Sequence, residues 1–150
     1  MQINLSASIP KDRFSVVEGL VEQCGLPVSD LNQVNWYCFA LLEQKGKIIA
    51  LGGLEATGKE LLLRSVAVDS DYRNQRFAEK IVFELFNAID NSQYSEVYLM
   101  TLDAEDYFSR RFAFASIERD AAPEDIRNST QFLGVCPASA TLMKKNLKHD

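Results

Sequence analysis

The passage from Leu61 to Leu102 constrains the fold more than any other part of the sequence. It begins with a strand-like run, LLLRSVAV (Leu61–Val68), and continues with apolar residues at helical spacing, which are Ala78, Ile81, Val82, Leu85, Phe86 and Ile89. A second apolar run, EVYLMTL (Glu96–Leu102), follows. A strand, a helix and a strand in this order predict two parallel strands joined by a right-handed crossover.

Strand-like runs joined by short turns precede that crossover. Trp36–Gln44 is followed by Lys45-Gly46-Lys47 and the run Ile48–Ala56, and Thr57-Gly58-Lys59 then leads to Leu61–Asp69. Short connections that contain glycine, placed between such runs, are typical of an antiparallel meander.

Further elements are expected on both sides of this region. They are a strand through Ile3, Leu5 and Ala7, a helix that begins near Ser8 and Pro10 and ends at Gly25, a short helix over Ser29–Gln33 capped by Ser29, a helix over Asp103–Arg111, a strand over Phe112–Glu118, a helical turn from Pro123 and a last strand over Ala138–Leu147. The sum is an α+β (mixed α/β) fold. Its mixed central sheet has an antiparallel N-terminal half and a parallel central strand pair, with helices on both faces.

Length and composition narrow the class of protein. A chain of 150 residues predicts a single domain over 1–150, and a formal charge of −5 argues against nucleic-acid binding. No apolar run reaches the ~18–20 residues of a membrane span, and the first residues do not resemble a secretion signal. We therefore expect a cytoplasmic protein with no membrane partner.

The cysteines and the single histidine give little support for metal or thiol chemistry. Cys24, Cys38 and Cys136 are far apart in the sequence, and His149 lies next to the C-terminus. Scattered cysteines without a C-x-x-C pair are typical of reduced, buried thiols. We expect no metal site.

The connection between Val68 and the following helix has the chemistry of an anion site. Backbone N–H groups in the first turn of a helix have no partner within the helix and lie at its positive end. Arg73 and Arg76 add cationic side chains that suit phosphate oxygens. The alternative is that both arginines are simply solvated.

The string V-A-V-D-S-D-Y-R-x-x-x-x-A resembles the acetyl-CoA-binding segment of the GNAT N-acetyltransferases, whose loop reads Q/R-x-x-G-x-G/A. Arg73 matches the first position of that loop and Ala78 the last. The resemblance implies that the backbone N–H groups of the loop hold the CoA pyrophosphate, with contributions from Arg73, Asn74, Gln75, Arg76, Phe77 and Ala78. It also implies that the strand Val66-Ala67-Val68 pairs through its backbone with the pantetheine arm.

Arg76 stands where the family has its middle glycine. If the backbone needs a positive φ there, an arginine is strained by ~1–3 kcal/mol. If the backbone is helical, that cost vanishes and the guanidinium adds a phosphate contact.

The order of elements resembles this family over nearly the whole chain. The tail Ala121–Lys145, with P-x-x-I-R and C-P-A-S-A, is most similar to small GNAT proteins associated with arsenic resistance, which themselves resemble acetylglutamate synthase catalytic domains.

The resemblance also implies candidate catalytic groups. The amide near Val66 is the implied oxyanion donor, and Tyr107, in DYFSRRFAF, is our candidate for the general acid. Alignment of Ala113-Phe114 with the Gly-Phe of the family places Ser109 in the tyrosine position instead. No base is apparent, because Glu55 and Glu60 flank turns and are expected to be solvated, which leaves an ordered water for that role.

Arginines supply the candidate contacts to the acceptor. Arg64 interrupts an apolar strand, where a charge needs an anionic partner or a wet face, and Ser65 lies beside it. Arg127 is the other candidate, with a surface salt bridge as its alternative reading. An arginine in the cleft would bind the carboxylate of an amino-acid-like acceptor.

The sequence thus predicts an N-acetyltransferase that uses acetyl-CoA as co-substrate and acetylates the amine of a small acceptor in a ternary complex. A homodimer is common in such families. The alternatives are an impaired protein of this fold that serves as a CoA sensor or protein-interaction module, and a scaffold that binds another anion.

Overall fold

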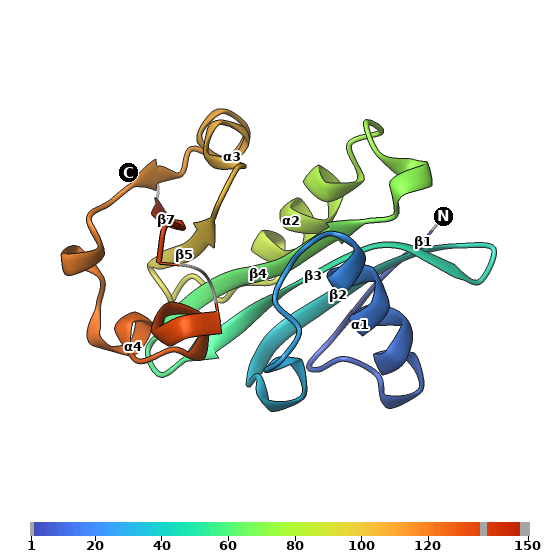
Figure 1. Ribbon diagram of the computed structural model, residues 1–150, viewed down its shortest axis with the longest axis horizontal. Coiled ribbons are helices and arrows are strands. Elements are labelled where there is room, and N and C mark those ends of the chain that lie inside the picture. The colour runs from blue at the N-terminus through green and yellow to red at the C-terminus, as the bar shows by residue number, and fades with distance from the viewer. Residues whose placement is uncertain (1, 136–137, 148–150) are drawn as a thin grey trace. The chain divides into compact units, whose positions relative to one another are not determined.

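The computed structural model describes residues 2–135 and 138–147, so Cys136 and His149 lie outside the described residues. The strands are β1 (Gln2–Ser6), β2 (Trp36–Gln44), β3 (Lys47–Thr57), β4 (Glu60–Val68), β5 (Glu96–Thr101), β6 (Ala115–Ser116) and β7 (Thr141–Asn146) (Figure 1). The α-helices are α1 (Phe14–Gln23), α2 (Phe77–Asn87), α3 (Glu105–Phe112) and α4 (Glu124–Arg127). Short helical turns are η1 (Lys11–Arg13), η2 (Leu31–Gln33), η3 (Ser70–Tyr72), η4 (Arg119–Ala121) and η5 (Gln131–Val135).

The strands form a mixed seven-stranded sheet in the order β1-β2-β3-β4-β5-β7-β6. β4 and β5 are parallel, whereas the pairs β1–β2, β2–β3, β5–β7 and β6–β7 are antiparallel. The predicted α+β fold, with an antiparallel first half and a parallel central pair joined through α2, is confirmed.

Two compact units divide the chain, and β4 contributes to both. The first unit contains Met1–Glu55 and Arg64–Ile89, and the second contains Ala56–Leu63 and Asp90–Asp150.

In the first unit, α1 and α2 cover opposite faces of the strands (Figure 1). Neighbouring glycines of β3 show this, because a Cβ at Gly52 would meet Ile81 of α2 at 2.9 Å. A Cβ at Gly53 would instead meet the Trp36 ring at 2.4 Å, on the face that α1 covers. The core on that face contains Ile9, Val17, Leu20, Val21, Leu31, Trp36, Phe39, Leu41, Ile48, Leu51 and Ala67.

Ser65 interrupts the regular alternation of β4. Its φ is +62°, in the left-handed region, within a strand that is otherwise extended. The Arg64 guanidinium lies 5.9 Å from the centre of the Trp36 ring, and Ala67 belongs to the same core as Trp36. In a regular strand, residues three apart face opposite sides, so Ser65 acts as a bulge that places Arg64 and Ala67 on one face.

In the second unit, Leu61–Leu63 of β4 pair in parallel with Val97–Leu99 of β5, and β7 lies antiparallel on the other side of β5. The core of this unit contains Leu62, Tyr98, Met100, Ala122, Ile126, Ala140 and Leu142. The turn between β3 and β4 is held from α4, because the Lys59 amide donates a hydrogen bond to Asp125 Oδ2 at 2.7 Å.

Two local predictions are wrong. The residue that precedes η2 is Asp30 rather than Ser29, and no side-chain hydrogen bond caps that turn. β6 covers only Ala115–Ser116 instead of Phe112–Glu118, because α3 continues to Phe112 and ends at Ala113 in the left-handed conformation. Both errors come from tertiary contacts or backbone conformations that local sequence patterns do not determine.

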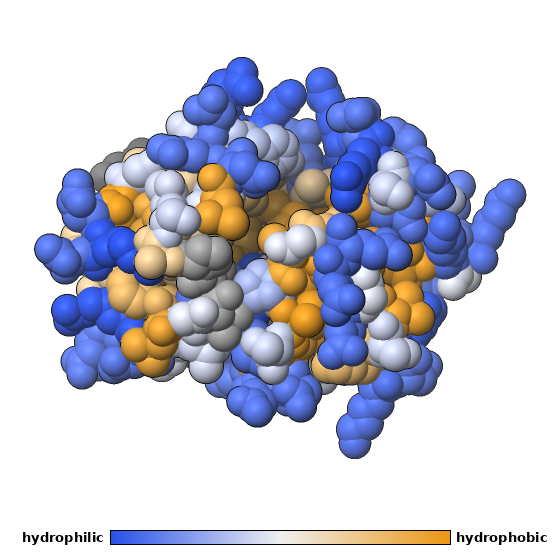
Figure 2. All heavy atoms as spheres, in the orientation of Figure 1, coloured by the Kyte–Doolittle hydropathy of each residue, from blue (hydrophilic) through white to orange (hydrophobic). Residues whose placement is uncertain are grey.

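The face of the molecule drawn in Figure 2 is mostly polar. Hydrophilic side chains project around the visible face, with hydrophobic side chains gathered between them (Figure 2). The exposed large apolar residues belong to separate elements and connections, and are Leu5, Val16, Phe83, Leu102 and Leu133. Among the described residues, no helix is long and apolar enough to cross a membrane.

The close approach of Gly53 to Trp36 predicts that Gly53→Ala destabilises the protein. An added methyl group 2.4 Å from a buried ring atom forces the ring or the strand to shift. We expect the free energy of unfolding in urea to fall by about 1–3 kcal/mol. The control is Gly19→Ala in α1, where nothing lies within 4 Å of the added atom. There we expect a gain of about 0.5–1 kcal/mol, and equal losses for both variants would contradict this account of the core.

Candidate functional site

A buried cluster of three charged residues lies in the first unit. Arg64 donates hydrogen bonds from Nη2 to Asp30 Oδ1 at 2.7 Å and from Nη1 to Asp30 Oδ2 at 2.8 Å. Nη1 also donates to Glu55 Oε1 at 3.0 Å. The side chain of Arg64 is fully buried. This guanidinium therefore has the anionic partners that the sequence led us to expect, and they belong to the chain itself.

Three different elements position the cluster. Asp30 is the last residue before η2, Glu55 lies near the end of β3 and Arg64 is in β4. Trp36, the first residue of β2, is the register partner of Glu55 and lies against the Arg64 guanidinium. A cation over an aromatic face adds to the stabilisation of a buried charge. The cluster thus ties β2, β3, β4 and the η2 loop together.

Burial and mutual contact determine the charge state of the cluster. Burial alone would lower the pKa of Arg64, but its hydrogen bonds and ion pairs with Asp30 and Glu55 outweigh that effect and raise the pKa. Desolvation raises the pKa of Glu55 above its ordinary value, although Arg64 opposes this shift. Arg64 therefore remains a cation, and Glu55 is the member of the cluster that takes up a proton more readily than an ordinary glutamate.

The expectation that Glu55 is a solvated turn residue is wrong, because the residue is only 8% exposed. The signal that could have identified it is Arg64 itself. A charge in the middle of an apolar strand requires a counter-ion, and Glu55 is the acidic residue nearest to it on the neighbouring strand of the meander.

The segment after β4 is anchored to β3. The Asp69 amide donates to the Ile49 carbonyl at 2.8 Å, and Asp69 Oδ1 accepts from the Asp71 amide at 2.9 Å. Lys47 forms an ion pair with Asp69 at 3.6 Å and lies 5.4 Å from the centre of the Tyr72 ring. These contacts fix the point from which the chain enters α2.

The N-terminus of α2 is open to solvent. Arg73–Arg76 are all exposed, and Arg76 occupies the N-cap position without a side-chain hydrogen bond to the first turn. Its φ and ψ are 63° and 26°, and Asn74 is also left-handed with φ 65°. Of the two conformations considered for Arg76, the structure has the strained one, which costs of order 1–3 kcal/mol for a residue other than glycine.

The predicted cofactor residues lie together at this end of the first unit. Val66 and Val68 are half-buried and alternate with the buried Ala67. The parallel pairing of β4 with β5 ends at Leu63, before this segment begins. Val66–Val68 therefore follow the last residue pair of that ladder and lead through η3 and the loop Arg73–Arg76 to the N-terminus of α2.

The thiols in this region are reduced. Cys24 and Cys38 are both free, and Cys38 is buried, as expected. Cys24 Sγ lies 3.5 Å from the Val68 carbonyl oxygen, and Arg73 Nη2 lies 3.6 Å from the same sulfur. Arg73 is thus held beside the end of β4.

Tyr107 and Arg127 belong to the second unit, whereas Arg64, Ser65 and the loop before α2 belong to the first. Tyr107 is half-buried in α3, with its ring 6.0 Å from that of Phe112, and Arg127 is exposed in the last turn of α4. Ala113 ends α3 with φ 61°, the conformation that glycine favours, which supports its alignment with the glycine of the family. The roles of Tyr107 and Arg127 stay predictions.

The two candidate acid positions in α3 are not equivalent. Tyr107 and Ser109 are two residues apart, so they lie roughly 200° apart around the helix. A donor at Tyr107 would therefore act from a different face of α3 than a donor at Ser109.

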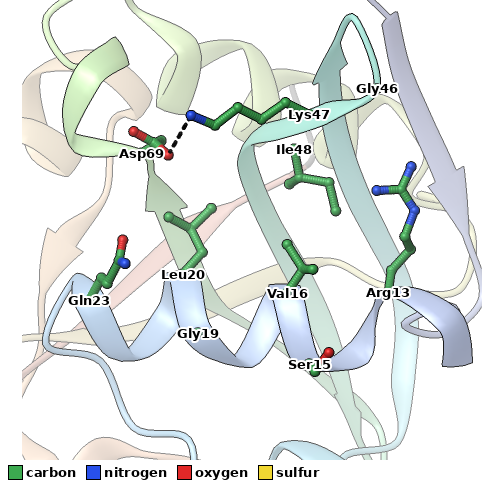
Figure 3. Close-up of a pocket in the computed structure, with 10 residues that line it drawn as sticks. All are labelled: Arg13, Ser15, Val16, Gly19, Leu20, Gln23, Gly46, Lys47, Ile48 and Asp69. Atoms are coloured by element: carbon green, nitrogen blue, oxygen red, sulfur yellow. Dashed lines mark ion pairs between the residues drawn. The ribbon is translucent and has the colours of Figure 1, made fainter.

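A hollow of about 460 Å³ lies between α1 and the turn that joins β2 to β3 (Figure 3). Its charged residues already have partners, because Arg13 bonds Glu43 at 2.6 Å and Lys47 pairs with Asp69. The hollow therefore offers no surplus charge to a ligand. Within the described part of the chain, no group of three or more His, Cys, Asp or Glu side chains is arranged to hold a metal ion.

Comparison with known proteins identifies the class. The model of the acetyltransferase (GNAT) family matches residues 15–114, and the chain therefore belongs to this family. No curated protein sequence matches it.

Solved structures share the fold at low sequence identity. N-acetylglutamate synthase from Neisseria gonorrhoeae, complexed with coenzyme A and N-acetyl-glutamate, superposes with a TM-score of 0.77 at 14% identity and covers 99% of this chain. The chain spans only 36% of that protein. A GNAT acetyltransferase from Staphylococcus aureus Mu50 gives 0.75 at 18% identity, covering 98% of this chain and 100% of its own. The ribosomal-protein-S18-alanine N-acetyltransferase from Escherichia coli gives 0.70 at 16%, covering 99% and 96%.

The left-handed conformation of Arg76 predicts that Arg76→Gly stabilises the protein. Glycine adopts this φ without strain, although it also makes the unfolded chain more flexible. We expect a net gain of about 1 kcal/mol in the free energy of unfolding. The control is Gln75→Gly, because Gln75 is not among the residues with positive φ. It should lose about 0.5–1 kcal/mol, and a loss in both variants would show that Arg76 is not strained.

Proposed function

We propose that this protein is an N-acyltransferase that moves the acetyl group of acetyl-CoA to the amine of a small acceptor. The observation that carries the proposal is the N-terminus of α2, which has no side-chain cap and follows Val66–Val68 after η3 and a short exposed loop. A strand edge followed by free helix amides suits a ligand that has an amide-rich arm and a pyrophosphate.

The residues in this region fit such a ligand. The backbone of Val66, Ala67 and Val68 pairs with the pantetheine arm, and the N–H groups of the loop from Arg73 through Asn74, Gln75, Arg76, Phe77 and Ala78 bind the pyrophosphate. The exposed guanidinium of Arg76 adds a charge-assisted contact to a phosphate oxygen. This contact explains why a strained arginine stands where glycine would be easier to accommodate. CoA is present in the neighbouring acetylglutamate synthase structure, which supports this reading.

The acceptor is a small amine, and an amino-acid-like acceptor is the narrower form of the proposal. Ser65 and Arg127 are proposed contacts to it, and Tyr107 is the proposed donor to the leaving thiolate. Arg64 has both terminal nitrogens bonded to carboxylates, so only its buried Nε has no hydrogen-bond partner among the described residues. Among the described residues, Arg64 therefore has only its Nε–H and the second N–H of Nη2 left to bind an acceptor carboxylate directly.

The finer relationships are part of the same proposal. The similarity of the tail Ala121–Lys145 supports membership of the small arsenic-resistance-associated subgroup. That subgroup resembles acetylglutamate synthases, and the structural similarity to one such enzyme is consistent with this proposal. We further propose that residues 1–150 form one acetyltransferase domain, that the protein acts in the cytoplasm, and that it assembles as a homodimer.

Ligand-induced stabilisation and thiol release test the proposal. Acetyl-CoA at 100-fold its Kd should stabilise the protein by about 2.7 kcal/mol, which raises Tm by roughly 5–10 °C. ADP, which has a pyrophosphate but no pantetheine, should give a smaller shift. A panel of primary amines, amino acids and amino-acid amides should then show acceptor-dependent release of the CoA thiol.

The Arg76→Gly variant is the internal control of this experiment. Its affinity for acetyl-CoA should fall about tenfold, because a phosphate contact worth about 1.4 kcal/mol is lost, even though the variant is more stable. A higher affinity would show that Arg76 is an obstacle rather than a ligand. Binding without thiol release from any amine would indicate a CoA sensor, and no binding would contradict the proposal as a whole.

A further inference from the structure

Among the described residues, the hydrogen bonds within the buried charge cluster use every carboxylate oxygen except one. Both oxygens of Asp30 accept from Arg64, one from each terminal nitrogen. The hydrogen bond of Glu55 goes to its Oε1. The side chain of Glu55 is 11% exposed, whereas that of Arg64 is not exposed at all. Glu55 therefore has a second oxygen, Oε2, that is not used within the cluster, and its side chain is partly accessible to solvent.

The charges of the cluster do not balance. One guanidinium faces two carboxylates, so the cluster holds one negative charge in excess when both acids are ionised. Arg64 and Asp30 form a bidentate pair that is close to neutral as a unit. Glu55 provides the surplus charge, and a buried negative charge attracts a cation or a proton. An ammonium group is the cation that an N-acyltransferase must receive and deprotonate.

The cluster is close in the chain to the proposed acyl donor site. Arg64 precedes Val66 by two residues, a span of roughly 7 Å along a strand. The left-handed Ser65 separates them, so the Arg64 side chain points to the face of Trp36 while β4 continues to the loop before α2. Arg64, which donates a hydrogen bond to Glu55, is thus joined through the single left-handed residue Ser65 to the segment that we propose pairs with pantetheine.

We propose that Glu55 binds the ammonium group of the acceptor through Oε2 and accepts its proton, with Arg64 and Asp30 as positioning residues. The proposal rests on the proposed function. It replaces the ordered water of the sequence-based expectation with a side chain of this protein.

The carboxylate of Glu55 takes one proton from R–NH₃⁺, which leaves R–NH₂ with its lone pair free. The nitrogen then forms a bond to the thioester carbonyl carbon, and the carbon–sulfur bond breaks with its electron pair on sulfur. The sulfur takes a proton from Tyr107, its proposed donor, and leaves as the CoA thiol. The second proton of the nitrogen passes to solvent, from which Tyr107 recovers its own proton. Glu55 then loses its proton to solvent.

The surroundings of Glu55 suit this role. Arg64 faces it from β4 and Asp30 faces it from the loop before η2. Desolvation raises the pKa of Glu55, and the charge of Asp30 acts in the same direction, while Arg64 opposes both. A base with a raised pKa accepts a proton from an ammonium ion at a smaller free-energy cost. Because the base acts only when ionised, kcat/KM falls as the pH drops through this raised pKa.

The pH dependence of kcat/KM for Glu55→Gln tests the proposal. With a primary alkylamine near pH 7, we expect the variant to be slower than the wild type by about 10²-fold. The difference should shrink toward high pH, where free amine is abundant. In the variant the acidic limb set by Glu55 should be replaced by a rate that rises with the fraction of free amine over the whole range. With a weakly basic amine that is already neutral at pH 7, the defect should nearly disappear.

Glu60→Gln is the matched control. The pKa of the Glu60 carboxyl is also raised, mainly by desolvation and then by Glu96 and Asp125. Glu60 is not part of the charge cluster, because Arg64 donates its hydrogen bonds to Asp30 and Glu55. This variant should keep the wild-type profile. Glu55→Asp tests the same point with the charge retained, and it should be slower than the wild type but keep the acidic limb. It also serves if Glu55→Gln does not fold, which unfolding and acetyl-CoA binding will show.

The failure of this inference and the failure of the proposed function have different signatures. A wild-type protein that releases no thiol with any amine overturns both. Turnover by the wild type, together with an unchanged pH profile in Glu55→Gln, overturns the role of Glu55 alone. A slower Glu55→Gln whose defect is the same at every pH and for every amine also overturns it, because that pattern belongs to a structural residue. Loss of the acidic limb in Glu60→Gln would transfer the role to Glu60.

Discussion

The buried guanidinium of Arg64 is the constraint on which much of the first unit depends. An unpaired cation in an apolar interior is too costly to persist, so the fold must bring carboxylates to it. Asp30 reaches it from the loop before η2 and Glu55 from β3, and Trp36 covers it from β2. Gly53 gives the Trp36 ring the room that this arrangement needs. One charged residue in β4 thus fixes the relative placement of three strands and a loop.

The same strand carries the features that the proposed function requires. Ser65 follows Arg64 in the left-handed conformation, and Val66–Val68 continue beyond the last residue pair of β4 with β5. Arg76, the N-cap residue of α2, then takes a second strained conformation, and its side chain makes no capping hydrogen bond. Strain of this kind persists where the surroundings over-determine it, and it gathers at functional sites. Charge burial and backbone strain along one continuous segment are what separate this region from a plain strand-to-helix connection.

Much of the fold could be predicted, because strands and helices leave local patterns of apolar residues. The bounds of β2 agree with the predicted run, and β5 and the buried face of α2 follow from spacing alone. The position of the loop before α2 also followed from sequence. The parallel pairing of β4 with β5 was accessible because the crossover rule leaves few alternatives.

The features that were missed depend on contacts between residues distant in sequence. Asp30 was overlooked because Ser29 offered a plausible cap, whereas Asp30 turns toward Arg64. Glu55 was read as solvated because a glutamate near a turn usually is, and only its ion pair shows otherwise. Nothing in a serine signals the left-handed conformation of Ser65. The sequence left two backbone conformations open for Arg76, and its φ of 63° shows that it adopts the left-handed one.

The most direct test of this account replaces the whole cluster with apolar residues of similar volume, as Asp30→Leu, Glu55→Met and Arg64→Met together. Such replacements of buried ion clusters are often neutral or stabilising by about 1–4 kcal/mol, so the triple variant should fold and still bind acetyl-CoA. Thiol release with a primary alkylamine at neutral pH is the measurement. We expect a rate at least about 10²-fold below that of the wild type. A folded triple variant that turns over at the wild-type rate would show that the cluster only stabilises the fold, and would contradict the account.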